Sequence, residues 1–226
     1  MQPTRPSSQQ VTHHPPTHLV QMPADHVFIE GLLELPDEPS GLVLFAHGSG
    51  SSRHSPRNNA VAKVLRDNGL GTLLMDLLTS AEDRDPRLRF DIDLLTQRLL
   101  DATQWAANCS ETAHLPIGYF GASTGAAAAL RAAAALGTKV HALVSRGGRP
   151  DLAGRADLAR VRTPTLLIVG GLDKEVLKLN QEAYALLPCT KQLSIVPGAT
   201  HLFEEADSLA QVANQAAAWF GHHLSF

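Results

Sequence analysis

Short apolar runs alternate with longer segments of mixed polarity along most of the chain. The runs are apolar at most positions, as expected of strands buried on both faces of a parallel sheet, and they lie at 41–46, 71–76, 117–120, 140–144, 165–169 and 192–196. Between them, segments such as 90–107 repeat apolar residues at helical spacing. This alternation predicts an α/β fold with a mainly parallel sheet that is covered by helices on both faces.

The remaining elements fit the same order. An early strand at 26–33 is expected to pair with the segment around 19–21. Further helices are expected near 58–68, directly after Ser123, from about Lys174, and from about 207 to 220.

One motif carries a chemical signal. The pentapeptide 121–125 (Gly-Ala-Ser-Thr-Gly) lies between the strand at 117–120 and an alanine-rich stretch. A strand, then G-x-S-x-G, then a helix is the nucleophile elbow of serine hydrolases, in which the serine occupies a strained turn and the glycines avoid collisions. The pentapeptide alone is a modest signal, because Ser123 could instead cap the following helix, so its context has to decide.

The base and the carboxylate that a nucleophilic serine requires follow in the expected order. Asp173 comes after the strand at 165–169 and two glycines, and His201 comes after the strand at 192–196 and a Pro-Gly turn. Both therefore lie at the carboxyl ends of strands, where open parallel sheets bind their ligands. Taken singly, Asp173 could be a helix N-cap and His201 a partly buried histidine. Together with Ser123 they are interpreted as a catalytic triad.

A glycine-rich turn predicts an oxyanion hole. The strand at 41–46 ends in the sequence His-Gly-Ser-Gly at 47–50. The backbone N–H groups of Ser49 and Thr124 are the expected donors to the oxyanion of an acyl-transfer reaction. The alternative is a flexible turn. A phosphate-binding loop is excluded because no Gly-Lys-Ser or Gly-Lys-Thr follows, and the third glycine of a G-x-G-x-x-G motif would fall at Arg53.

Arginines near these loops are candidate substrate-binding residues. Arg53 and Arg57 follow the oxyanion turn, and Arg146 ends the strand at 140–144. An arginine there could hold a substrate carboxylate through two parallel hydrogen bonds, and Arg53 and Arg146 are the candidates for this role. The favoured alternative is that these arginines pair with acids such as Asp151 or Asp76 and shape the loops.

At these residues the chain resembles a known family. From about residue 25 onward it is similar to α/β-hydrolases of the dienelactone hydrolase-like group, through the motifs at 47–50, 121–125, 171–173 and 198–201. The run at 51–58 resembles the small serine hydrolases within that group. Dienelactone hydrolase itself uses a cysteine nucleophile, so the resemblance does not imply dienelactone as the substrate. Some relatives are fused to a phosphoribosyltransferase domain, and none is expected in this chain.

The sequence thus predicts a serine hydrolase that cleaves carboxylic esters through an acyl-enzyme, without a metal or an organic cofactor. The roughly twenty residues between Ser145 and Thr165 leave little room for a helical lid, which favours small, soluble acyl substrates. Two kinds of alternative remain open. One is a thioesterase, acyltransferase or peptidase that uses the same triad, and the other is a binding protein without catalytic activity on a hydrolase scaffold.

Composition limits the partners and the location. The chain has 226 residues, enough for one α/β domain with a substantial core, and a formal net charge of −3, which gives no general attraction to nucleic acid or acidic membranes. Residues 1–17 are rich in Pro, Ser, Thr, Gln and His and read as a disordered leader, with the catalytic domain expected over 18–226. No apolar run approaches the ~20 residues of a membrane span. A cytoplasmic enzyme with a small-molecule ester substrate is expected.

Overall fold

A computed structural model describes residues 17–224, and within them eight strands form a single sheet. Their order across the sheet is β1-β2-β4-β3-β5-β6-β7-β8. The strands are β1 (His18–Ala24), β2 (Val27–Glu34), β3 (Leu42–Ala46), β4 (Gly71–Met75), β5 (Ile117–Ala122), β6 (Val140–Arg146), β7 (Thr165–Gly170) and β8 (Lys191–Val196). The pairs β1–β2 and β2–β4 are antiparallel, and the other pairs are parallel.

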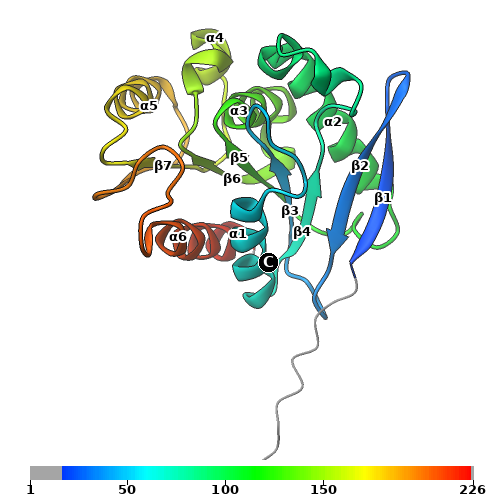
Figure 1. Cartoon of the computed structure of the whole chain (residues 1–226). Coiled ribbons are helices and arrows are strands. Elements are labelled where there is room, and N and C mark those ends of the chain that lie inside the picture. The colour runs from blue at the N-terminus through cyan, green and yellow to red at the C-terminus, as the bar shows by residue number, and fades with distance from the viewer. Residues whose placement is uncertain (1–16, 225–226) are drawn as a thin grey trace, which may run out of the picture.

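Helices cover both faces of the sheet (Figure 1). They are α1 (Pro56–Asp67), α2 (Ile92–Asn108), α3 (Thr124–Leu136), α4 (Arg155–Leu158), α5 (Lys174–Leu186) and α6 (Ser208–His223). Helices α1 and α6 pack side by side on one face, over a core that includes Val61 and Phe220. Helices α2, α3 and α5 pack on the other face, over a core that includes Leu99 and Ala128. This arrangement confirms the predicted α/β architecture.

Local sequence explains where the elements begin. Helix α1 starts at Pro56, two residues before the predicted start, because proline suits the first helical position and Ser55 Oγ accepts a hydrogen bond from the Asn58 N–H. The central strands β3, β4, β5 and β7 are buried at every position, in keeping with their uninterrupted apolar runs.

Some short segments differ from the sequence-based picture. The stretch between β4 and α2, which had no predicted element, contains two short 3₁₀ helices at Glu82–Arg84 and Leu88–Phe90. The 3₁₀ helices at Gly137–Lys139 and Pro150–Ala153 and the four-residue helix α4 were not predicted either. The predicted disordered leader, apart from Thr17, falls outside the described residues. Within residues 17–224, each helix is too short or too polar to traverse a lipid bilayer.

Candidate active site

The site lies where five parallel strands end at one edge of the sheet. The strand register aligns Ala46 with Gly121, Ala122 with Arg146, and Gly170 with Val196. The loops that follow β3, β5, β6, β7 and β8 therefore leave the sheet at the same level. All of the predicted catalytic residues are on these loops.

Ser123 occupies a strained turn between β5 and α3. Its backbone angles are φ 50° and ψ −120°, a region that residues with a side chain rarely adopt. Its N–H donates to the Arg146 carbonyl, and its own carbonyl accepts from the Arg149 N–H, so the turn is held from the loop after β6. Ser123 is half-buried, and its hydroxyl makes no hydrogen bond within residues 17–224.

Two glycines make this turn possible. A Cβ added to Gly121 would lie 2.5 Å from the Ala126 Cα, and one added to Gly125 would lie 2.1 Å from the Ala46 carbonyl oxygen. Both distances are far below van der Waals contact, and both neighbours are backbone atoms. The alanine side chains of α3 are small and almost all buried, so the helix approaches the sheet closely and fixes the position of Ser123.

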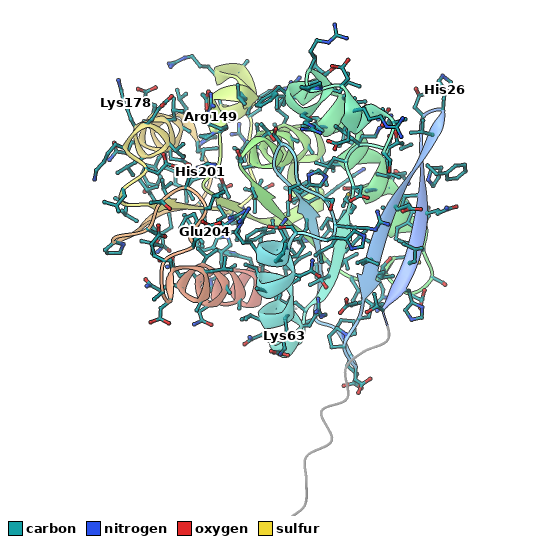
Figure 2. All side chains as sticks on the ribbon, viewed as in Figure 1. His26, Lys63, Arg149, Lys178, His201 and Glu204 are labelled. Carbon is teal, nitrogen blue, oxygen red and sulfur yellow. The ribbon has the colours of Figure 1, made fainter. Side chains whose placement is uncertain are left out.

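Asp173 and His201 are in direct contact. Asp173 follows β7 and His201 follows β8, and the distance from His201 Nδ1 to Asp173 Oδ2 is 2.7 Å. The Asp173 side chain is 14% exposed and that of His201 is 39% exposed, so the carboxylate is the better-shielded partner. The N–H and the hydroxyl of the preceding residue, Thr200, both donate hydrogen bonds to Glu205 Oε1. The loop before α6 therefore presents His201 in a fixed orientation (Figure 2).

Ser123 and His201 both border the loop after β6. A Cβ added to Gly147 would lie 3.5 Å from His201 Nδ1. Gly147 directly follows Arg146, whose carbonyl accepts the hydrogen bond from the Ser123 N–H. The structure thus brings all three predicted triad residues to one loop cluster. The serine–histidine hydrogen bond of such sites often forms or tightens only with substrate in place.

The predicted oxyanion turn lies against the serine. A Cβ added to Gly48 would be 3.0 Å from the Ser123 Cβ. The N–H groups of Ser49 and Thr124 have no acceptor among the described residues, which leaves both donors available. Thr124 is the first residue of α3, so its N–H also belongs to the positive end of that helix.

His47 anchors this turn, a role that the sequence-based analysis missed. Its Nε2 accepts a hydrogen bond from the Leu77 N–H at 3.0 Å, so its proton resides on Nδ1, which donates to the Gly48 carbonyl at 2.9 Å. Burial lowers the pKa of His47 below its usual value, although nearby Asp76 and Asp83 act in the opposite direction. The neutral ring therefore joins the oxyanion turn to the segment after β4. The only sequence signal for this was a histidine directly before a glycine turn.

The segment between β4 and α2 borders a small cavity beside Ser49 and Thr124, the two predicted oxyanion donors. Apolar side chains of Leu78 and Leu95 line it together with the turn at 47–50, Thr124, Asp83 and Arg89. An ion pair between Arg89 and Asp83 holds this segment together. These residues were not predicted to be near the site, because nothing in their sequence distinguishes them from an ordinary loop.

The two candidate substrate-binding arginines have different surroundings. Arg53 forms ion pairs with both Glu30 and Asp76, so its guanidinium is occupied by protein carboxylates. Arg146 is only 8% exposed, and it has neither an ion pair nor a hydrogen bond from its side chain within the described residues. Arg149 rather than Arg146 pairs with Asp151.

Comparisons with known proteins bear on the family. No family model matches the chain. Two curated proteins of Mycobacterium tuberculosis, from strains CDC 1551 / Oshkosh and H37Rv, are each 58% identical to it over 205 residues, and their names describe candidate phosphoribosyl transferases. The matched region is 91% of this chain but 46% of those proteins, so the chain spans about half the length of these relatives.

Solved structures match along the whole domain. A dienelactone hydrolase from Anabaena variabilis is 52% identical, with a TM-score of 0.91 over 93% of this chain and 99% of that one. Est1E from Butyrivibrio proteoclasticus matches with a TM-score of 0.78 over 91% of this chain and 98% of that one, at 15% identity, which shows the shared fold alone. The identity and near-complete coverage of the Anabaena protein establish that this chain belongs to the dienelactone hydrolase family of α/β-hydrolases.

Proposed function

We propose that the protein is a serine hydrolase that cleaves carboxylic esters of small acyl groups through a Ser123–His201–Asp173 triad. The observation that carries the proposal is the strained turn of Ser123 at the same sheet edge as the hydrogen-bonded Asp173–His201 pair. Backbone strain of this kind persists only where the surrounding structure enforces it, and it is concentrated at functional sites. Family membership supports a hydrolase and leaves the bond that is cleaved to be tested.

The mechanism begins with proton transfer. His201 takes the proton from the Ser123 hydroxyl as that oxygen attacks the ester carbonyl carbon. Asp173 holds the imidazole in the tautomer that leaves Nε2 free to accept the proton, and it stabilises the imidazolium that forms. The carbonyl oxygen becomes an oxyanion, which accepts hydrogen bonds from the N–H groups of Ser49 and Thr124. Each such donor contributes about 3 kcal/mol to transition-state stabilisation.

The acyl-enzyme is then formed and hydrolysed. The tetrahedral intermediate collapses, the C–O bond to the alcohol breaks, and His201 gives its proton to the departing alcohol. A water molecule enters, His201 removes its proton, and the resulting hydroxide attacks the acyl carbon. The bond from the acyl carbon to Ser123 Oγ then breaks, and His201 returns its proton to that oxygen, which releases the carboxylic acid and restores the serine hydroxyl. The chain's own residues supply every group in this scheme, so the proposal includes no metal or organic cofactor.

Acyl groups of short length fit the surroundings of the site best. The segment between β6 and β7 contains only a 3₁₀ helix at Pro150–Ala153 and the four-residue helix α4. The cavity beside Thr124 is small and is bounded by Leu78 and Leu95. Each buried methylene would add about 0.8 kcal/mol of binding where apolar surface is available to cover it. We therefore expect kcat/KM to be higher for acetyl to butyryl esters than for octanoyl and longer esters, and a steady rise to dodecanoyl esters would contradict this.

A fluorophosphonate probe tests the nucleophile. The wild-type protein should label rapidly at Ser123, and Ser123→Ala should neither label nor hydrolyse p-nitrophenyl acetate, with a loss of roughly a million-fold in kcat. Ser194→Ala, a change on strand β8, is the matched control and should behave as wild type. Retention of more than a few per cent of activity by Ser123→Ala would exclude this residue as the nucleophile.

The alternatives are distinguished by substrate. A panel of matched esters, thioesters, lactones and anilides separates an esterase from a thioesterase or a peptidase, and added alcohols reveal acyl transfer. A binding protein without catalytic activity would fail to label with the probe at all. The phosphoribosyl transferase names belong to proteins more than twice as long as the matched region, so we do not extend that activity to this chain. A cytoplasmic location remains part of the proposal.

A further inference from the structure

Asn180 is a buried polar residue of helix α5 that contacts the loop after β6. The residue is 0% exposed. Its Nδ2 donates one hydrogen bond to the Val176 carbonyl at 2.8 Å, one turn earlier in the helix, and another to the Gly148 carbonyl at 3.0 Å. Both partners are acceptors, so they fix which end of the amide faces them. The side chain of Asn180 therefore links α5 to the loop after β6.

An apolar side chain would be the ordinary choice at this position. The Asn180 Oδ1 is shielded from solvent and has no hydrogen-bond partner among residues 17–224. Burying a polar atom without a partner destabilises the folded state, and leucine, which is similar in size, would avoid that loss. What asparagine adds over leucine is the bond to the Gly148 carbonyl, which accepts a hydrogen bond from no other group in the described part of the chain.

The loop that Asn180 contacts also holds the nucleophile. The Ser123 N–H donates to the Arg146 carbonyl at 3.3 Å, and the Arg149 N–H donates to the Ser123 carbonyl at 3.1 Å. Gly148 lies between these two contacts along the chain, so its position bears on both. These two bonds keep Ser123 at its strained backbone angles, φ 50° and ψ −120°.

Helix α5 connects this loop to the acid of the proposed triad. Asp173 is the N-cap residue of α5, about two turns before Asn180. Asp173 Oδ2 also lies 2.7 Å from His201 Nδ1. Since the helix between them is a rigid element, the Asn180 amide sets where the loop, and with it Ser123, stands relative to His201.

We propose that Asn180 is a positioning residue, whose amide holds the loop after β6 so that the Ser123 hydroxyl stays aligned with His201. This inference rests on the proposed function, because it concerns the geometry of the same triad. Asn180 is fully buried and cannot touch substrate. A misplacement of about 1 Å at the reacting atoms can lower the rate by about a hundredfold. Loss of the amide should therefore lower kcat and leave KM nearly unchanged.

Two variants remove the bond to the loop in different ways. Asn180→Leu removes the amide altogether. Asn180→Thr keeps a bond within the helix, as Thr96 and Thr103 do in α2 through their hydroxyls to the carbonyls four residues earlier, but it is too short to reach Gly148. Each variant should lower kcat for p-nitrophenyl acetate by about ten- to a hundredfold, with KM within about threefold of wild type. Labelling by a fluorophosphonate probe should slow by the same factor.

A matched control separates positioning from general stability. Thr163 is buried, and its hydroxyl donates to the Val140 carbonyl at 3.2 Å, at the opposite edge of the sheet where β6 and β7 begin. Thr163→Val should leave kcat within about twofold of wild type, even where it lowers the melting temperature. An equal loss of kcat in Thr163→Val, or a loss in both Asn180 variants that matches their loss of folded protein by circular dichroism, would overturn the proposal.

Amide hydrogen exchange tests the loop without relying on catalysis. The Ser123 and Arg149 N–H groups should exchange at least about tenfold faster in Asn180→Leu than in wild type, and at the wild-type rate in Thr163→Val. Should Asn180→Leu not fold, Asn180→Thr replaces it with the same expectation.

The outcomes distinguish the two proposals. If the wild type cleaves esters and labels with the probe but folded Asn180 variants keep kcat within about twofold, the positioning role is refuted and the proposed function stands. If the wild type neither cleaves nor labels, the proposed function fails, and the exchange rates alone decide whether Asn180 holds the loop. Unchanged exchange at both amides would refute that role.

Discussion

Replacing Ser123 by glycine should stabilise the protein relative to replacing it by alanine. Both changes remove the hydroxyl, so they differ only in the Cβ atom. With φ 50° and ψ −120°, a residue that carries a Cβ pays about 1–3 kcal/mol for its backbone conformation. Glycine escapes this cost, but its greater freedom in the unfolded chain costs about 0.4–1 kcal/mol. The difference favours Ser123→Gly over Ser123→Ala by about 1 kcal/mol in the free energy of unfolding.

Urea unfolding followed by circular dichroism measures this difference, provided that both variants unfold in one transition with the same m-value. The control is Ala135→Gly, at an exposed position in α3 with an ordinary helical backbone, which should destabilise by about 1 kcal/mol. Glycine in place of alanine is therefore expected to raise the free energy of unfolding at position 123 and to lower it at position 135. If Ser123→Gly is less stable than Ser123→Ala, which is the order found at ordinary helical positions, the backbone at Ser123 is not strained.

Three further predictions concern the residues around the serine. Asp173→Asn should lower kcat by about 10⁴-fold while leaving the melting temperature nearly unchanged, because the amide favours the wrong imidazole tautomer; steady-state kinetics with p-nitrophenyl acetate test this. Gly125→Ala should destabilise by more than about 3 kcal/mol in urea unfolding, since its Cβ would meet the Ala46 carbonyl oxygen at 2.1 Å, whereas Gly221→Ala, whose Cβ would meet nothing within 4 Å, should not. Burial keeps His47 neutral in the folded state, so the unfolded chain takes up a proton first as the pH falls below about 6.5, and the free energy of unfolding should fall there. Urea unfolding measured between pH 7.5 and 5.5 should show that the free energy of unfolding depends less on pH in His47→Asn than in the wild type. An identical pH dependence in the two proteins would contradict the neutral state assigned to His47.

The buried strands and the three triad residues could be predicted from the sequence, because each has a local physical cause. The strands β3 and β7 are apolar throughout, and burial on both faces requires that pattern. The elbow glycines precede and follow a serine at the junction of a strand and a helix, a spacing that few other structures require. Asp173 and His201 were found through their place after strands, and the structure brings them to 2.7 Å.

Features that depend on tertiary contacts could not be predicted from the sequence. The bond from the Leu77 N–H to His47 joins the loops after two neighbouring strands, and no local pattern encodes it. The same is true of Arg146, because the lack of an ion pair for it among residues 17–224 becomes evident only when all neighbouring carboxylates are placed. The positive φ of Phe203 also has no sequence signature, because glycine or asparagine would be the usual residue there.

The order of strands in the sheet has a consequence for how the enzyme gains activity as it folds. Strand β5, which leads to Ser123, pairs on one side with β3, whose Leu42 lies opposite Ile117 across a long loop of intervening chain. Closing such loops costs entropy before any pairing compensates for it, so sheets of this kind form slowly. His201 follows β8, which is the last of the described strands to be synthesised and lies at one edge of the sheet. A chain emerging from the ribosome therefore contains Ser123 long before it contains His201. Under the proposed mechanism, hydrolase activity would report the completion of the sheet rather than its beginning.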